Sequence, residues 1–230
     1  MKKNFLLFAL AILMFSCQNS NQENSQNENA SDSNASKSET LQMLTFNKDV
    51  IKKLPNIEGD FLYGFSWKDK AGVNQLLFTK AVKFVQMKGE EHGIGDDFGY
   101  LKAYHFAGEN DSYKLVRMIQ DGNSQGCSNP PFAIDLDFYE KSISITDLDE
   151  NGYAEVIFMY YILCASEICP VPTKLMLLEN GEKYAIRGDS YIAEINSGGE
   201  KNMDASFKKL NPKIQDLANQ TWEKFCKTKP

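Results

Sequence analysis

The sequence predicts a mainly β (α+β) fold: an antiparallel β-meander, forming a sheet or a sandwich, with a C-terminal helix. Three observations support this prediction. Apolar and polar residues alternate in several segments between residues 61 and 187, which is typical of strands with one buried face. Turn-forming residues separate some of these segments at hairpin spacing. Near the C-terminus the apolar spacing becomes helical.

Aromatic residues indicate the first strands. In the segment 61–67 they occupy every second position, which predicts a half-buried strand. The segments 100–106 and 113–119 alternate in the same way and flank the turn sequence Gly-Glu-Asn-Asp-Ser. Together these two segments predict a hairpin.

The later strands follow the same logic. The segment 132–138 alternates between apolar and polar residues, and its partner begins at 143–145. The segment 155–163 is almost wholly apolar and therefore predicts a central strand. The segments 173–178 and 183–187 flank Asn180-Gly181, a pair that strongly favours a two-residue hairpin turn.

The C-terminal segment predicts a helix that covers one face or an open end of the sheet. Asn211-Pro212 can supply a cap and a first helical residue in mid-segment. The residues that define the helical spacing are Phe207, Leu210, Ile214, Leu217, Ala218 and Phe225.

The N-terminus predicts a lipoprotein export signal over residues 1–16. Lys2 and Lys3 give a positive start, a short apolar stretch follows, and Ser16 directly precedes Cys17. The apolar stretch is shorter than the roughly 20 residues that span a bilayer. We therefore expect cleavage before Cys17 and lipidation of this cysteine. The lipid would anchor the protein in the cell envelope, at the outer membrane, on its periplasmic or surface face.

Residues 17–40 are predicted to form the lipidated start and a polar, disordered tether. Past Cys17, the only apolar residues in this segment are Ala30 and Ala35, too few to offset the entropy of ordering. Residues 41–230 are long enough for a single domain with its own core. Because Lys2 and Lys3 leave with the signal, the formal net charge changes from −6 to −8. This acidity argues against a nucleic-acid partner.

The segment 147–155 has the spacing of a calcium-binding loop. Gly152 allows a sharp turn at the sixth position, and the Tyr153 carbonyl is available at the seventh. Oxygen side chains stand at the first, third, fifth and ninth positions, which are Asp147, Asp149, Asn151 and Glu155. Such hard oxygen ligands suit Ca²⁺. The alternative is a tight turn that holds no metal, because the same residue types form turns unaided.

The loop is similar to the nine-residue calcium loop between strands in the FG-GAP repeats of integrin alpha chains. It differs from an EF-hand, because Phe158 occupies the twelfth position, where an EF-hand has a bidentate glutamate. The resemblance implies a structural Ca²⁺ whose site is closed by the ninth-position carboxylate. The implied ligands are Asp147, Asp149, Asn151, the Tyr153 carbonyl and Glu155.

Two further groups of side chains are candidates for chemistry. His92 lies in the acid-rich segment 90–97, which a solvated loop explains more simply than a metal or acid–base site. His105, the second histidine of the chain, falls on a predicted strand. Asp135 and Asp137 share one strand face, and paired carboxylates can hydrolyse glycosides, although an outward polar face is the simpler explanation. The sequence contains neither a Gly-x-Ser-x-Gly elbow nor a phosphate-binding glycine loop.

Four cysteines besides Cys17 are disulfide candidates. An even number in an exported domain predicts that all four are oxidised, with three possible pairings. In one alternative Cys164 and Cys169 close a short hairpin loop. In another, Cys127 pairs with Cys164, and Cys169 fastens the C-terminal helix through Cys226.

Several ordered motifs in residues 60–190 carry a family resemblance. They are Gly64-Phe-Ser-Trp67-Lys-Asp69-Lys-Ala-Gly72-Val-Asn74, Ala103-Tyr104-His105, Ile145-Thr146-Asp147-Leu148-Asp149 with Gly152 and Glu155, Met159-Tyr160 with Cys164, and Lys183-Tyr-Ala-Ile-Arg187-Gly188. Together they resemble a family of exported bacterial envelope proteins labelled surface polysaccharide biosynthesis proteins. The resemblance implies a role in building or displaying surface polysaccharide, but none of the motifs is catalytic. Cys169 departs from the family pattern, so the disulfide pairing stays open.

These observations lead to two hypotheses about function. The first is a non-enzymatic outer-envelope lipoprotein with a structural calcium loop, involved in the biosynthesis, assembly or display of surface polysaccharide and binding a glycan or another envelope protein. The second is a carboxylate-dependent enzyme that acts on surface polysaccharide, through Asp135 and Asp137 or the cluster around His92. The missing nucleophile motif favours the first hypothesis.

Overall fold

The computed structural model describes residues 40–86, 95–127, 134–164 and 168–227, which belong to one folded unit, Ser38–Pro230. The predicted signal, Cys17, almost all of the tether and His92 lie outside these residues. The strands are β1 (Gln42–Leu44), β2 (Asp60–Asp69), β3 (Gly72–Gln86), β4 (Gly95–Glu109), β5 (Ser112–Cys127), β6 (Ile134–Thr146), β7 (Glu155–Cys164), β8 (Pro172–Glu179), β9 (Glu182–Asp189), β10 (Tyr191–Ile192), β11 (Ser197–Gly198) and β12 (Lys201–Met203). The helices are η1 (Lys48–Lys53), η2 (Ala193–Ile195), η3 (Ala205–Lys209) and α1 (Pro212–Phe225), of which only α1 is an α-helix.

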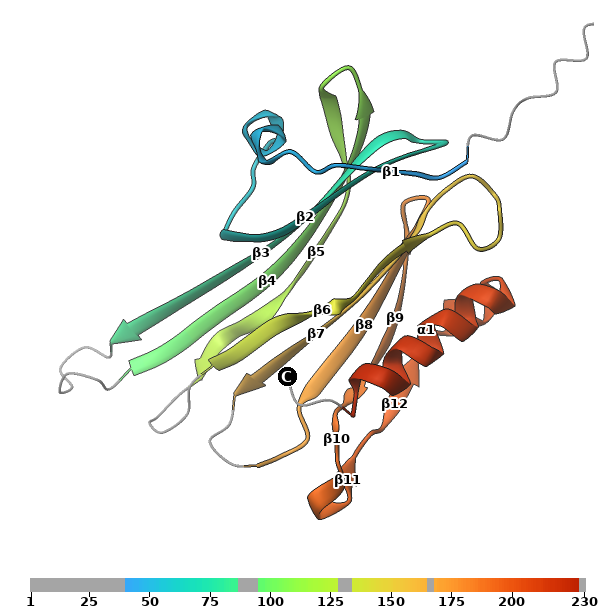
Figure 1. Ribbon diagram of the computed structural model, residues 1–230. Helices are drawn as coiled ribbons and strands as arrows, with labels where there is room; N and C mark the ends of the chain where they lie inside the picture. Colours follow the sequence, from blue (N-terminus) through green and yellow to red (C-terminus); the bar gives the residue numbers. More distant parts are fainter. Residues whose placement is uncertain (1–39, 87–94, 128–133, 165–167, 228–230) are drawn as a thin grey trace, which may run out of the picture. The chain divides into compact units, whose positions relative to one another are not determined.

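The strands form two antiparallel sheets, which confirms the predicted fold class (Figure 1). The first sheet has the order β1-β2-β3-β4-β5, and the second has the order β12-β9-β8-β7-β6. Most sequence neighbours therefore pair directly, as in a meander. The strands β10 and β11 form a separate small hairpin.

One core lies between the two sheets and is dominated by aromatic side chains from both. Phe78 of β3 is its centre: its ring centroid lies 4.8 Å from that of Phe138 on β6 and 5.1 Å from that of Phe158 on β7. Trp67 of β2 is completely buried in the same core. Because side chains alternate across each strand, the opposite face of the first sheet remains available for other contacts.

The helix α1 covers the outer face of the second sheet (Figure 1). Ile214, Ala218 and Trp222 recur every four residues and are completely buried there. The predicted cap is confirmed, since the Asn211 side chain accepts a hydrogen bond from the Lys213 N–H at 3.0 Å. Among the described residues, no helix is long and apolar enough to cross a membrane.

The predicted hairpin turns are present, but the sequence analysis did not predict β3. Asn180 and Gly181 have φ of 43° and 79°, and the turn between β4 and β5 uses two positive φ angles in the same way. In β3, Leu76 and Phe78 face the core between the sheets, whereas Leu77 faces a second apolar cluster outside. Burial on both faces removes the alternation that identifies a strand.

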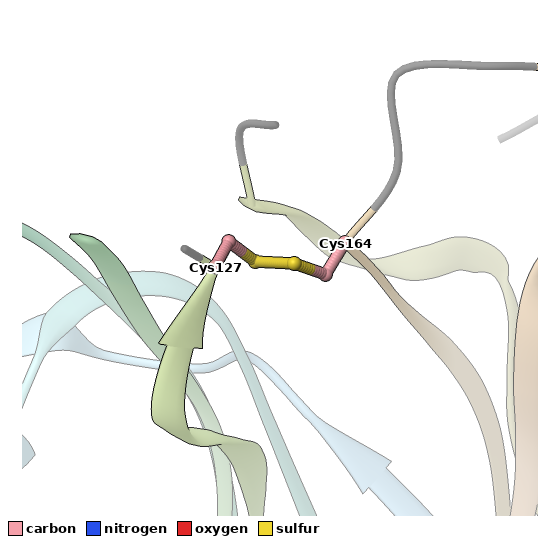
Figure 2. The surroundings of a disulfide bond; sticks show 2 residues. All are labelled: Cys127 and Cys164. Atoms are coloured by element: carbon pink, nitrogen blue, oxygen red, sulfur yellow. A yellow bond between two sulfur atoms is a disulfide. The ribbon is translucent and has the colours of Figure 1, made fainter. Parts of the chain in front are cut away.

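A disulfide joins Cys127, at the end of β5, to Cys164, at the end of β7 (Figure 2). Their Cα atoms lie 5.7 Å apart, and the bond links the two sheets. This pair is one half of the alternative that joined Cys127 to Cys164 and Cys169 to Cys226, and it excludes the pair Cys164–Cys169. The expectation that all four cysteines are oxidised is wrong for the other two, since Cys169 and the buried Cys226 are free.

Candidate functional site

A groove of about 560 Å³ lies on the outer face of the first sheet. Part of this face is covered by η1, whose Val50 packs with Leu54 against Leu77, Tyr104 and Phe106. The uncovered part, over β4 and β5, forms the groove. Its lining consists of Pro55, Asn56, Glu58, Tyr100, Lys102, Tyr104, Leu115, Met118 and Gln120. Its volume falls within the range of small-molecule sites.

The wall of the groove is aromatic and apolar. Tyr100 lies beside Gly122 of β5, where a Cβ atom would come within 2.8 Å of the Tyr100 Cδ1 atom. The lack of a side chain at Gly122 therefore leaves room for the Tyr100 ring against the sheet. Leu115 and Met118 remain 49% and 43% exposed, although each belongs to a regular strand. Large exposed apolar side chains beside a cavity are typical of binding surfaces.

The charges in the groove compensate each other. Lys102 forms an ion pair with Glu58, and the Glu58 N–H donates to the Tyr104 hydroxyl at 3.2 Å. Burial disfavours the charged form of Lys102, but the hydrogen bond to Glu58 and the interactions with Tyr104 and the Glu58 charge together outweigh this effect, so the pKa of Lys102 is raised. The Thr79 hydroxyl donates to the Glu58 carbonyl at 2.7 Å and holds this segment in place. The groove thus presents apolar surface and neutral amides around a paired cation.

The predicted oxygen loop brings three carboxylates together between β6 and β7. One oxygen each from Asp147, Asp149 and Glu155 lies within 4.8 Å of the others. Glu155 is completely buried and accepts hydrogen bonds from the Leu148 N–H at 3.0 Å and from the Thr146 hydroxyl at 2.8 Å. Burial raises the pKa of Glu155, and the charge of Asp149 adds to this effect.

The other two predicted ligands, Asn151 and Tyr153, lie in the same loop. The Asn151 side-chain NH₂ donates to Asp149 at 3.1 Å and to Glu179 at 2.6 Å. Its side-chain oxygen accepts the Tyr153 N–H at 2.7 Å. In this arrangement the amide of Asn151 offsets the negative charge of the loop, and its oxygen is directed back to the backbone.

Glu179 is a member of the loop cluster that the sequence analysis missed. It is the last residue of β8 and lies opposite Glu155 of β7 in the sheet register. Burial raises its pKa, and the charges of Asp149 and Asp147 raise it further. Glu179 directly precedes the predicted Asn180-Gly181 turn. Pairing β8 with β7 in the observed register would have placed it beside Glu155. That register depends on sheet assembly and cannot be read from spacing alone.

The loop is attached to the first sheet through the turn between β2 and β3. The Lys70 N–H donates to the Gly152 carbonyl at 2.8 Å, and the Ala154 N–H donates to the Asp69 carboxylate at 3.0 Å. Asp69 is buried and accepts three further hydrogen bonds, all at 2.8–2.9 Å, from the Trp67 indole N–H, the Ala71 N–H and the Asn74 amide. Asp69 belongs to the motif 64–74, but its sequence neighbours alone predict no role for it.

The remaining candidates do not form a site among the described residues. Asp135 accepts the Tyr161 hydroxyl at 3.1 Å, and Asp137 pairs with Lys80 at 3.2 Å. Neither carboxylate lines the groove on the first sheet, so the paired-carboxylate arrangement of the enzyme hypothesis gains no geometric support. In the acid-rich segment around His92, Gly95, Asp96 and Asp97 lie on β4, and residues 90–94 are outside the described residues.

No family model, no curated protein and no solved structure matches the chain.

Proposed function

We propose that this protein is a non-enzymatic lipoprotein of the cell envelope that binds a surface polysaccharide and takes part in its biosynthesis, assembly or display. The observation that carries the proposal is the groove on the outer face of the first sheet. It combines aromatic and apolar surface with amides and a neutralised ion pair. Sugar rings have apolar faces and hydroxyl edges, which such a surface can accommodate without an unpaired charge.

The groove proposal predicts that Tyr100→Ala weakens glycan binding about tenfold or more, because the change removes one of the two aromatic rings in the lining but leaves the sheet intact. Binding is measured by calorimetry with polysaccharide purified from the organism's own envelope. Tyr191→Ala is the matched control, since Tyr191 lies on β10, away from the groove, and should bind as wild type does. Equal affinity of the wild type and the Tyr100 variant would contradict the proposed site.

The envelope location predicts that Cys17→Ala releases the protein from the membrane fraction. Lipidation would supply the anchor, because the acidic domain gains no attraction from anionic headgroups. The measurement is fractionation with mass analysis of the mature N-terminus. A Cys17→Ala protein that still sediments with membranes, together with a wild type that has no lipid mass, would contradict the proposal.

We further propose that the loop 147–155 binds a structural Ca²⁺. Asp147, Asp149 and Glu155 would supply carboxylate oxygens, and the Tyr153 carbonyl and the Asn151 side-chain oxygen would complete the protein's share of the shell, once the Asn151 amide turns away from Asp149 and Glu179. The clustered carboxylates fit this role, because they repel one another and a bound cation would compensate their charge. The attachment of the loop to Lys70 and Asp69 would pass this stabilisation on to the first sheet.

Calcium is expected to raise the melting temperature. At about 100 times Kd, binding stabilises the folded state by about 2.7 kcal/mol, which corresponds to about 5–10 °C for a domain of this size. Thermal unfolding with Ca²⁺ and with chelator measures the effect. Asp149→Ala should abolish the difference, whereas Asp216→Ala, on the exposed face of α1, should keep it. A wild-type melting temperature that does not respond to millimolar Ca²⁺ would identify the loop as an ordinary turn.

A further inference from the structure

A second cavity, of about 200 Å³, lies where the inner face of the first sheet meets the loop 147–155. Asn74 and His105 line it, and both are buried. Tyr153 also lines it, and the exposed residues Val116 and Asn180 mark its mouth, where it opens to solvent. Because His105 alternates with Tyr104 along β4, this cavity and the groove lie on opposite faces of the sheet.

A chain of hydrogen bonds determines the orientation of His105. The Asn74 amide donates to Asp69 at 2.8 Å and to the Gly72 carbonyl at 3.0 Å, so its oxygen faces His105. The His105 Nε2 atom lies 2.9 Å from this oxygen and therefore carries the proton that forms the bond. The imidazole also stacks on Trp67, with ring centroids 5.3 Å apart.

The second ring nitrogen of His105 is a hydrogen-bond acceptor. Burial lowers the pKa of His105 to about 4, although the charge of Asp69 acts in the opposite direction, so the ring is neutral at pH 7. With the proton on Nε2, the Nδ1 atom keeps a lone pair. None of the described residues hydrogen-bonds to Nδ1.

The charged groups at the cavity are already engaged in contacts within the protein. The Asp69 carboxylate already accepts four hydrogen bonds. The Arg117 guanidinium, beside the mouth, donates to the Gly181 carbonyl at 2.7 Å. The Lys70 ammonium lies 5.0 Å from the Tyr153 ring centroid. The Nδ1 atom of His105 is a neutral acceptor, so a ligand with a hydroxyl donor can satisfy it without burying an ionic charge.

We propose that this cavity binds one neutral sugar ring, with a ligand hydroxyl donating a hydrogen bond to Nδ1 of His105. The volume equals that of about six or seven waters, enough for one ring but not for two. Tyr153 supplies an aromatic wall. The site is separate from the groove, and the proposal does not depend on the groove's function.

The experiment titrates the full folded domain with free glucose, galactose and N-acetylglucosamine and with their methyl glycosides, each up to about 50 mM, since Kd is expected on the order of 1–10 mM. Nitrogen NMR follows the His105 Nδ1 signal and the Trp67 indole signal. At least one sugar should shift both signals in a saturable way, with the Nδ1 shift expected from a new hydrogen bond. Binding of a methyl glycoside assigns the pocket to the end of a glycan chain. Binding of the free sugar alone assigns it to a monosaccharide.

Two matched substitutions at exposed valines separate this cavity from other surfaces. Val116→Phe narrows the mouth and should abolish the shifts, whereas Val82→Phe, on the far part of β3, should keep them. Tyr100→Ala removes a groove residue and should also keep them, so a failure of the groove proposal does not affect this test. The proposal is overturned if no sugar shifts the His105 and Trp67 signals, or if the shifts persist unchanged in Val116→Phe.

Discussion

Replacing Asp69 by alanine is expected to lower the free energy of unfolding by about 3–5 kcal/mol. The carboxylate accepts hydrogen bonds from Trp67, Ala71, Asn74 and Ala154, and all four donors lose their partner at once. An unsatisfied buried donor costs about 1–3 kcal/mol, and water can reach some of these groups, which keeps the total below the simple sum. The loop 147–155 also loses the hydrogen bond that joins Ala154 to the turn between β2 and β3. Urea unfolding measures the change.

Two further variants test whether the loss of stability is specific to the Asp69 carboxylate. Asp216→Ala, at an exposed position on α1, should change stability by less than about 0.5 kcal/mol. Asp69→Asn keeps one acceptor oxygen but turns an amide NH₂ toward the remaining donors, so its stability should lie between those of wild type and Asp69→Ala. If Asp69→Ala unfolds within about 1 kcal/mol of wild type, the four hydrogen bonds do not hold the turn and the loop together.

Loss of the disulfide Cys127–Cys164 is expected to cost about 4 kcal/mol. The two cysteines are 37 residues apart in sequence, and the bond restricts the unfolded chain over this length. Without the bond the unfolded chain gains conformational entropy, which favours unfolding. The double variant Cys127→Ala with Cys164→Ala removes the bond without leaving a free thiol at either position. Urea unfolding of this variant, and of wild type under reducing conditions, should show the same loss.

Cys169→Ala is the control for the disulfide, because Cys169 is free and partly exposed and should change stability little. Thiol counting on the unfolded, unreduced domain should find two free thiols, from Cys169 and Cys226. A double variant as stable as wild type, or four free thiols, would contradict the pairing.

Local patterns in the sequence predicted most of the fold. The aromatic alternation of 61–67, the apolar run of β7 and the Asn180-Gly181 turn each depend on residues a few positions apart, and each element is present. The strand β3 was missed for a local reason, because a segment buried on both faces has no alternation to detect.

The candidate sites were predictable only where their residues are neighbours in sequence. The loop 147–155 brings its own carboxylates together, so its spacing was sufficient to predict the cluster. Glu179 joins this cluster only because β8 pairs with β7 in one particular register. The groove forms only where β4, β5 and the segment 55–58 come together. The residue pattern within one strand cannot predict that three separate segments meet.

The sequence by itself determined which segments are strands, where the hairpins turn and where α1 begins, because backbone preference and the alternation of side chains act over a few residues. Only the tertiary structure could assign Cys127 to Cys164 and place Asp69, Asn74 and His105 in one buried chain of hydrogen bonds beside the loop 147–155. These contacts join residues up to 85 positions apart. They depend on strand register and on the packing of one sheet against the other, since both together set which distant side chains share a buried face.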